Sequence, residues 1–473
     1  MKNKFYITTT LPYVNAKPHI GFALEIIEAD VLARFHRQPG DDVFFNTGTD
    51  EHGLKIFRKA EELGITVQKY CDDNAAEFSK LKETLNLSVD NFIRTSDEKH
   101  ILAAQEFWKK CDASGDIYKK SYKTKYCVGC ESEKTDSELI DGKCPIHPNM
   151  EIEIIEEENY FFRFSKYQQA LLDLYEKNSE FVLPKKRLNE IKKFVEGGLE
   201  DFSISRLKTK MPWGIAVPGD DAQVMYVWFD ALVNYISAIG WPSDIDKFNA
   251  WWPVVQIAGK DNLRFQSAMW QAMLFSAGLP NSKQVFINGF IGVNGQKMSK
   301  SLGNVISPFE MVEKFGIDGT RYLILSFGNF GEDIDVSWEK FTEKFNADLA
   351  NGLGNLVSRF VKLSENFNLE MEVIESTSNL RLYDKELIEK MELGQCLSLI
   401  WSKIRNLNKY IEDNKPWELV KSDQKEFSHV MQQLYFGIYE IAESLTPFMP
   451  DTAEKIKKAL ETKQVEPLFQ RIK

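Results

Sequence analysis

The stretch KFYITTTLPYVNAKPHIGFALEIIEADVLARFHR, residues 4–37, decides the fold class. It begins with a short β-rich run, and an irregular segment that is closed by Pro18 follows. Apolar residues then recur every three or four positions, which predicts a helix over 19–37. The order repeats at once, with a strand and its terminal loop expected at 41–50 and a helix at 52–64. This α/β alternation predicts a doubly wound, Rossmann-like parallel sheet, in which ligands bind at the carboxyl ends of the strands.

The same alternation returns later in the chain. Residues 253–259 and 284–289 predict two further strands, with a helix at 265–278 between them. The sheet pattern is interrupted by a region rich in Lys and Glu, and the pattern becomes helical after about residue 340. We therefore expect a sheet domain that is split by an insertion and followed by an all-α helix-bundle domain. The expected limits are 1–114 and 216–325 for the two halves of the sheet domain, 115–215 for the insertion, 326–345 for a linking segment and 346–473 for the α-helical domain.

Composition restricts the class of protein further. The 473 residues are 43% hydrophobic and 27% charged, which is typical of a globular protein that is not embedded in a membrane. The N-terminus lacks the apolar core of roughly 7–15 residues that a signal peptide needs. The long apolar stretch at 224–241 contains Asp230 and Asn234, which argues against a membrane span. We expect a cytoplasmic protein. Its net charge of −11 argues against indiscriminate nucleic-acid binding. The stretch 185–193 is a candidate for a local basic face.

Three of the six cysteines form a metal-binding pattern in the expected insertion. Cys127 and Cys130 are separated by two residues, as are Cys144 and His147, and 13 residues lie between the two pairs. Each pair can chelate one ion from a tight turn, and three thiolates with one imidazole complete a tetrahedral Zn²⁺ site. A site with no open position is structural, so we expect one Zn²⁺ per chain that clamps a small knuckle.

Two short motifs point to phosphate chemistry. KMSKS, residues 297–301, carries Lys297 and Lys300 on a glycine-flanked loop after the last expected strand. His19 opens a helix at the end of the first strand, where backbone N–H groups attract anions. Both motifs are therefore expected at the same edge of the sheet. Two lysines at this edge can hold the outer phosphates of ATP and stabilise the charge that develops as pyrophosphate leaves.

These motifs carry a family resemblance. The chain resembles class I aminoacyl-tRNA synthetases, whose two signatures read HIGH and KMSKS, and within them it is most similar to the methionyl-tRNA synthetase family over essentially its whole length. The stretches that carry the resemblance are TLPYVNAKPHIG, NTGTDEHG, CVGC with CPIH, YVWFDAL, AGKD, NGQKMSKSLGNV, NLVSR and NKPW.

The resemblance implies a ligase that activates L-methionine with ATP and Mg²⁺ to methionyl-adenylate and pyrophosphate. The methionyl group then passes to initiator and elongator tRNA(Met). His19, Lys297 and Lys300 match the positions that contact the reacting phosphates, and Lys300 is the stronger candidate contributor. The positions that match the ATP site are Asn15, His19, Gly21, Asp261, Lys297 and Lys300.

The resemblance also implies the remaining sites. Asp50 matches the carboxylate that pairs with the substrate ammonium. The positions that match the wall of the methionine pocket are Leu11, Tyr13, Trp228, Ala231, Leu232, Tyr235 and Gln266. The positions that match the family residues recognising the CAU anticodon are Asn355, Arg359 and Trp417. The expected insertion of about 100 residues is too short for the editing domain of the leucine, isoleucine and valine enzymes. We expect a monomer.

Two positions depart from the family pattern. Phe22 stands at the fourth position of the first signature, so the motif reads HIGF, and Gln266 stands where the family usually has a pocket histidine. A glutamine still forms hydrogen bonds but does not change charge. Two alternatives therefore accompany the main interpretation: a divergent paralogue with another amino-acid preference, and a non-catalytic RNA-binding or regulatory paralogue.

Overall fold

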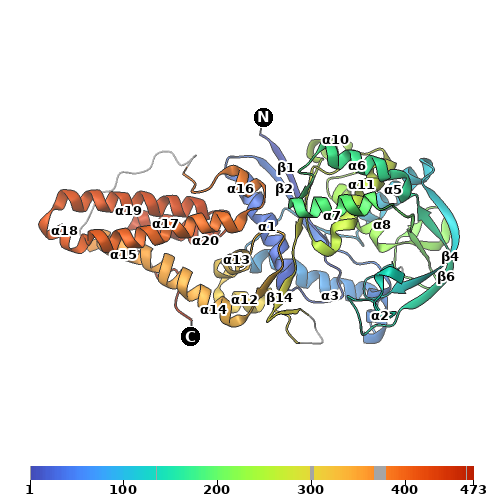
Figure 1. Ribbon diagram of the computed structural model, residues 1–473, viewed down its shortest axis with the longest axis horizontal. Coiled ribbons are helices and arrows are strands. Elements are labelled where there is room, and N and C mark those ends of the chain that lie inside the picture. Colours follow the sequence, from blue (N-terminus) through green and yellow to red (C-terminus); the bar gives the residue numbers. More distant parts are fainter. Residues whose placement is uncertain (1, 135, 299–302, 367–379, 465, 473) are drawn as a thin grey trace.

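The computed structural model describes residues 2–134, 136–298, 303–366, 380–464 and 466–472 (Figure 1). The molecule is elongated, with the β-sheets and their helices at one end and a rod of helices at the other (Figure 1). Lys300 and residues 367–379 lie outside the described residues.

A six-stranded sheet forms the centre of the α/β part, and all neighbouring strands in it are parallel. Its order is β3 (Asn91–Arg94), β2 (Asp42–Thr49), β1 (Lys4–Thr9), β12 (Val255–Gly259), β13 (Gln284–Asn288) and β7 (Val182–Leu183). The chain builds outward from β1 through β2 to β3, and it later places β7, β12 and β13 on the other side of β1. The predicted doubly wound fold is therefore confirmed, and its topological switch point lies between β1 and β12.

Both faces of this sheet are buried. Phe5 and Ile7 of β1 belong to one apolar core with residues of α1 (Ile20–Arg37), whereas Tyr6 belongs to a second core with residues of α5 (Glu98–Ala113). Successive side chains of a strand point to opposite faces, so each face requires its own layer of helices. Further helices of this part of the chain include α2 (Leu54–Leu63), α3 (Val67–Ser79), α4 (Leu81–Thr84), α10 (Ile245–Trp251) and α11 (Trp270–Ala277).

The expected insertion contains a long antiparallel ribbon. Its sheet has the order β5 (Ser132–Lys134), β4 (Ile117–Cys127), β6 (Glu153–Phe162) and β8 (Phe202–Ser203), and the ribbon lies at the end of the molecule farthest from the helical rod (Figure 1). The helices α6 (Gln168–Lys177) and α7 (Lys185–Glu196) flank β7, which joins the parallel sheet although it falls within 115–215. A second small sheet follows, with the order β10 (Ala216–Val217), β11 (Asp220–Met225) and β9 (Ser205–Leu207).

A small sheet and two helices connect the parallel sheet to the helical rod. The sheet has the order β15 (Gln296–Lys297), β14 (Ile291–Val293) and β16 (Ile334–Val336), and the helices are α12 (Pro308–Phe315) and α13 (Ile317–Leu325). Arg321 of α13 is buried, pairs with Asp30 of α1 at 2.8 Å, and donates to the carbonyl oxygens of Phe448, Pro447 and Leu85. This guanidinium joins the helical part of the chain to the sheet.

The C-terminal part is helical, as predicted. Ile400, Ile404, Leu407 and Ile411 are buried on one face of α17 (Leu393–Asn414), and Lys415 ends this helix in the left-handed region at φ 42° before Pro416 opens the next one. No helix among the described residues is both long and apolar enough to cross a bilayer. The other elements are α14 (Trp338–Lys344), η6 (Phe345–Gly354), α15 (Asn355–Asn366), α16 (Lys385–Glu389), α18 (Pro416–Ser422), α19 (Gln424–Leu445) and α20 (Pro450–Thr462).

Candidate active site

A buried carboxylate marks the switch point between β1 and β12. Glu25 of α1 accepts two hydrogen bonds from Thr10, from the backbone N–H and from Oγ1, both at 2.6 Å. It also accepts a backbone hydrogen bond from Gly259, so it joins the carboxyl ends of the two central strands. Burial raises the pKa of Glu25 to about 8. This residue was not among the predicted site residues, because its only signal in the sequence is an acidic side chain within the apolar pattern of α1.

The two signature motifs meet at this edge. His19 is the N-cap of α1, and its Nδ1 accepts from the Gly21 N–H at 3.1 Å. A Cβ atom on Gly21 would lie 2.9 Å from Cε1 of His19 and 3.6 Å from Cε of Met298, the second residue of KMSKS. The Ile20 N–H also donates to the carbonyl oxygen of Ile306 at 3.1 Å. Met298 therefore packs against the first turn of α1, beside the anion-attracting end of that helix.

Lys297 and Asp261 lie near one another at this edge of the sheet. Burial raises the pKa of the Asp261 carboxyl, and the Lys297 ammonium acts in the opposite direction. The Nζ of Lys297 lies 5.0 Å from the centre of the Phe290 ring. A Cβ on Gly259 would lie 2.8 Å from Oδ1 of Asp261, so a side chain at position 259 would displace that carboxylate.

Asp50 provides a buried carboxylate with unused hydrogen-bonding capacity. It follows β2, pairs with Tyr13 in an isolated parallel bridge and is 5% exposed. Its side chain accepts from the His52 N–H, but its Oδ1 has no hydrogen-bond partner among the described residues. Burial, followed by repulsion from Asp230, raises the pKa of Asp50 well above that of an ordinary aspartate. A buried carboxylate oxygen without a donor suits a cationic ligand.

The residues expected to line the methionine pocket come from three segments. Leu11 and Tyr13 follow β1 and are partly buried. Trp228 and Ala231 lie on α8 (Val227–Ala231), and Leu232 follows it. Tyr235 lies on α9 (Asn234–Ser237), so these residues are divided between two short helices. Gln266 lies on the π-helical turn η4 (Phe265–Met269).

Direct contacts connect these short helices to η4. The Trp228 ring stacks on that of Phe265 with centroids 3.8 Å apart and an interplanar angle of 8°. Gln266 donates from Nε2 to the hydroxyl of Tyr235 at 2.7 Å and accepts from Nε2 of Gln256 at 2.8 Å. Both functional atoms of the Gln266 amide are therefore held by buried partners, which fixes the orientation of the Tyr235 hydroxyl.

The predicted metal ligands converge. The donor atoms of Cys127, Cys130, Cys144 and His147 all lie within 4.8 Å of one another. The Sγ of Cys130 lies 3.4 Å from that of Cys144 and 3.2 Å from Nδ1 of His147. A Cβ on Gly129 would lie 2.5 Å from Cγ of His147, so the turn between the first two cysteines needs a glycine. Three sulfurs and one nitrogen at these separations fit one tetrahedral Zn²⁺.

Two of the three residues expected to read the anticodon are in contact. The guanidinium of Arg359, on α15, lies 5.7 Å from the centre of the Trp417 ring, on α18. Arg359 also pairs with Glu412 at 2.7 Å, and Trp417 is 38% exposed. Asn355 is an exposed residue at the start of α15. α18 lies at the end of the helical rod, far from the sheets (Figure 1).

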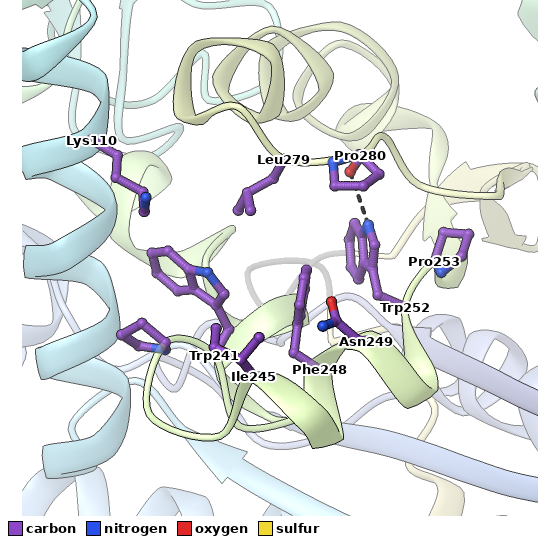
Figure 2. Close-up of a pocket in the computed structure, with 10 residues that line it drawn as sticks. Lys110, Trp241, Ile245, Phe248, Asn249, Trp252, Pro253, Leu279 and Pro280 are labelled. Carbon is purple, nitrogen blue, oxygen red and sulfur yellow. Dashed lines mark hydrogen bonds between the residues drawn. The ribbon is translucent and has the colours of Figure 1, made fainter.

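A separate cavity of about 520 Å³ lies away from these residues. Figure 2 shows the rings of Trp241, Phe248 and Trp252 on one side of it and Leu279 on the other. Trp252 precedes β12 and Leu279 precedes β13, so the cavity lies at the amino ends of the strands, opposite the edge where the two signature motifs meet. None of the predicted site residues lines it.

Comparisons with known proteins agree with this geometry. Residues 5–153 and 139–361 match the family described as tRNA synthetases class I (M). A methionine–tRNA ligase of Thermotoga maritima is 43% identical, over 96% of this chain and 74% of that protein. One of Brucella suis is 42% identical, over 96% of this chain and 91% of that protein. Mycobacterium tuberculosis methionyl-tRNA synthetase in complex with methionyl-adenylate superposes with a TM-score of 0.89 at 36% identity, over 97% of this chain and 93% of that chain. The chain belongs to the methionyl-tRNA synthetase family of class I tRNA synthetases.

Proposed function

We propose that the chain is a methionine–tRNA ligase, which activates L-methionine with ATP to methionyl-adenylate and then transfers the methionyl group to tRNA(Met). The observation that carries this proposal is the contact between the two signature motifs at the switch point of the sheet, where Cε of Met298 lies 3.6 Å from the place that a Cβ on Gly21 would occupy. The relatives named above support the same activity. They give no support to a paralogue of another specificity or to a non-catalytic one.

We assign the ATP-binding role to the residues that match the family's ATP site. In the first step the methionine carboxylate attacks the α-phosphate and pyrophosphate leaves, so the protein has to position the reactants and stabilise negative charge. His19 and the first turn of α1 face the phosphates, with Asn15 and Gly21 beside the nucleotide. Asp261 receives the ribose hydroxyls. Lys297 and Lys300 neutralise the departing pyrophosphate, together with the Mg²⁺ that accompanies ATP.

The unpartnered oxygen of Asp50 supports its proposed role as acceptor for the methionine ammonium. The substrate thioether then lies on the wall formed by Leu11, Tyr13, Trp228, Ala231, Leu232 and Tyr235. Sulfur packs favourably at the edges of aromatic rings. The Gln266 amide supports this wall from behind, because its hydrogen bond holds the Tyr235 hydroxyl in place.

The two departures from the family pattern have a local explanation. Phe22 packs edge-on against Phe78 of α3, with ring centroids 5.7 Å apart, so the fourth signature position contributes to the core here. We propose that His19 alone supplies the imidazole contact with ATP. Gln266 keeps two hydrogen bonds in a buried site without a group that titrates near neutral pH.

The remaining assignments extend this proposal. Cys127, Cys130, Cys144 and His147 hold one structural Zn²⁺, which supplies a cross-link for the knuckle and takes no part in the chemistry. Asn355, Arg359 and Trp417 read the anticodon by stacking and planar hydrogen bonds. We retain the domain limits given above, with the difference that β7 returns to the parallel sheet. We further propose a cytoplasmic monomer.

The test is pyrophosphate exchange with each amino acid in turn, followed by charging of initiator and elongator tRNA. We expect exchange that depends on methionine and charging of both tRNAs. Exchange with a different amino acid would replace the proposed substrate. Absence of exchange with every amino acid would contradict a catalytic role altogether.

A further inference from the structure

Glu131 connects the metal-binding turn to the methionine pocket. It directly follows the ligand Cys130, and its side chain is 5% exposed. Its Oε1 accepts from the Lys55 N–H at 2.7 Å and from the Tyr13 hydroxyl at 3.3 Å. Its other oxygen, Oε2, accepts from the hydroxyl of Tyr126 in a short hydrogen bond. One carboxylate therefore joins the insertion, the loop after β1 and the first turn of α2.

The first turn of α2 depends on this carboxylate. Its N-cap is Gly53, which has no side chain to accept from the free N–H groups of the turn. A Cβ on Gly53 would lie 2.0 Å from the hydroxyl oxygen of Tyr13, so no capping residue can replace this glycine while Tyr13 keeps its position. Carboxylates stabilise helix N-termini, where N–H groups lack partners. Glu131 supplies the cap from a distant part of the sequence.

The position of Glu131 is set by the cysteine turn. Its backbone adopts a φ of 48°, in the left-handed region that favours glycine and that a glutamate rarely adopts. Its N–H donates to the carbonyl oxygen of Val128 at 3.3 Å, which closes the turn between Cys127 and Cys130. Lys55 adds a second connection, because its Nζ donates to the carbonyl oxygen of Gly129 at 3.3 Å. A metal ion that fixes this turn also fixes the carboxylate.

We propose that Glu131 is a positioning residue that couples occupancy of the Cys127–Cys130–Cys144–His147 cluster to methionine affinity. The inference rests on the proposed function and on the zinc assignment. When the cluster is empty, the turn relaxes, and the Tyr13 hydroxyl and the Lys55 N–H lose their acceptor. The backbone of Tyr13 forms a β-bridge with that of Asp50, the proposed acceptor for the substrate ammonium, so Asp50 loses support when Tyr13 moves. Coupling is reciprocal, so bound methionine also strengthens metal retention.

The test is a thermodynamic cycle on the full chain. Methionine affinity is measured by calorimetry with zinc-loaded and chelator-treated protein, for the wild type, Glu131→Ala and Glu153→Gln. Glu153 is the matched control, because it also extends from the insertion to α2, but its ion pair with Arg58 at 2.9 Å is exposed. Zinc content and circular dichroism accompany every sample.

We expect zinc removal to weaken methionine binding by the wild type and by Glu153→Gln about tenfold, a typical coupling between two sites. Zinc-loaded Glu131→Ala should show the same weakening, with one zinc still bound, and zinc removal should then change its affinity less than about twofold. Glu131→Gln, which keeps the volume and one acceptor, should recover part of the affinity, and it provides the same comparison if the alanine variant unfolds.

The inference is overturned if loaded Glu131→Ala binds methionine as the wild type does, or if zinc removal weakens its binding as much as it weakens wild-type binding. Zinc-loaded wild-type protein that binds no methionine would overturn the proposed function instead, because that outcome does not depend on Glu131.

Discussion

Replacing Asp50 by Asn should stabilise the unliganded protein while it abolishes tight methionine binding. The carboxylate is buried among acidic groups, with repulsion from Asp230 the largest electrostatic contribution. Its Oδ1 has no donor among the described residues, and an unsatisfied buried polar atom costs about 1–3 kcal/mol. An amide has the same shape, has no charge and can donate towards the neighbouring carboxylates. We therefore expect the free energy of unfolding to rise by about 1–3 kcal/mol.

The same substitution removes the proposed partner of the substrate ammonium. A buried charge that loses its only partner is penalised by about 3–5 kcal/mol, which corresponds to a loss of about two to four orders of magnitude in methionine affinity. Thermal unfolding and methionine-dependent pyrophosphate exchange measure the two effects. A rise in thermal midpoint of about 2–4 °C per kcal/mol is expected for a domain of about 150–250 residues, and a smaller rise for a larger one.

The pH dependence has a definite sign. Because the pKa of Asp50 is raised in the folded chain, the folded state binds this proton more tightly than the unfolded state does. Stability of the unliganded protein therefore decreases as pH rises from the ordinary range of an aspartate through the raised pKa. The advantage of Asp50→Asn should be largest above that raised pKa and should disappear in acid.

The adjacent residue, Glu51, is the control, because it is equally buried but its carboxylate is fully paired. It accepts from Arg94 at 2.7 and 2.9 Å and from Thr49 at 2.8 Å. Glu51→Gln should destabilise the protein, opposite in sign to Asp50→Asn, because it weakens the ion pair of a buried carboxylate. An Asp50→Asn variant that is less stable than the wild type, or that retains wild-type methionine affinity, would refute the reasoning.

Three further outcomes are expected. Trp417→Ala should reduce tRNA charging about tenfold or more and leave pyrophosphate exchange nearly unchanged, because base stacking contributes about 1–3 kcal/mol. The control is Phe436→Ala, which removes an equally exposed ring (38%) and should affect neither assay. Cys144→Ser should lower zinc content from one per chain to less than half in metal analysis of protein purified without chelators, because it removes one of four ligands. Gln266→Leu should raise the methionine KM about tenfold and leave the ATP KM unchanged. Gln256 and Tyr235 each lose a buried hydrogen-bond partner, and a buried polar group without a partner costs about 1–3 kcal/mol.

Periodicity was sufficient to predict the centre of the fold. The apolar spacing after Pro18 locates α1, and the predicted strands at 253–259 and 284–289 correspond to β12 and β13. The strand β7 was not predicted as part of the sheet, because Val182–Leu183 is too short to show a period. Its place at the sheet edge is set by pairing with β13, which is a tertiary interaction. The division of residues 227–237 into two helices was also not predicted, because the helical spacing of the apolar residues continues across the break.

Buried acidic residues were the part of the site that periodicity could not find. Glu25 interrupts the apolar pattern of α1 in the sequence. In the structure it accepts hydrogen bonds from the backbone N–H and the hydroxyl of Thr10. Glu131 lies beside a cysteine motif, and its sequence context is that of a residue exposed to solvent. In the structure it caps α2, whose own N-cap residue is a glycine. A carboxylate acquires such a role only when several donors from separate segments converge on it, and one local sequence window contains at most one of those segments. The metal ligands differ because each turn contains two ligands at a spacing that the ion itself imposes. Sequence patterns therefore identify groups that act locally, whereas groups that connect segments become visible only after the chain has folded.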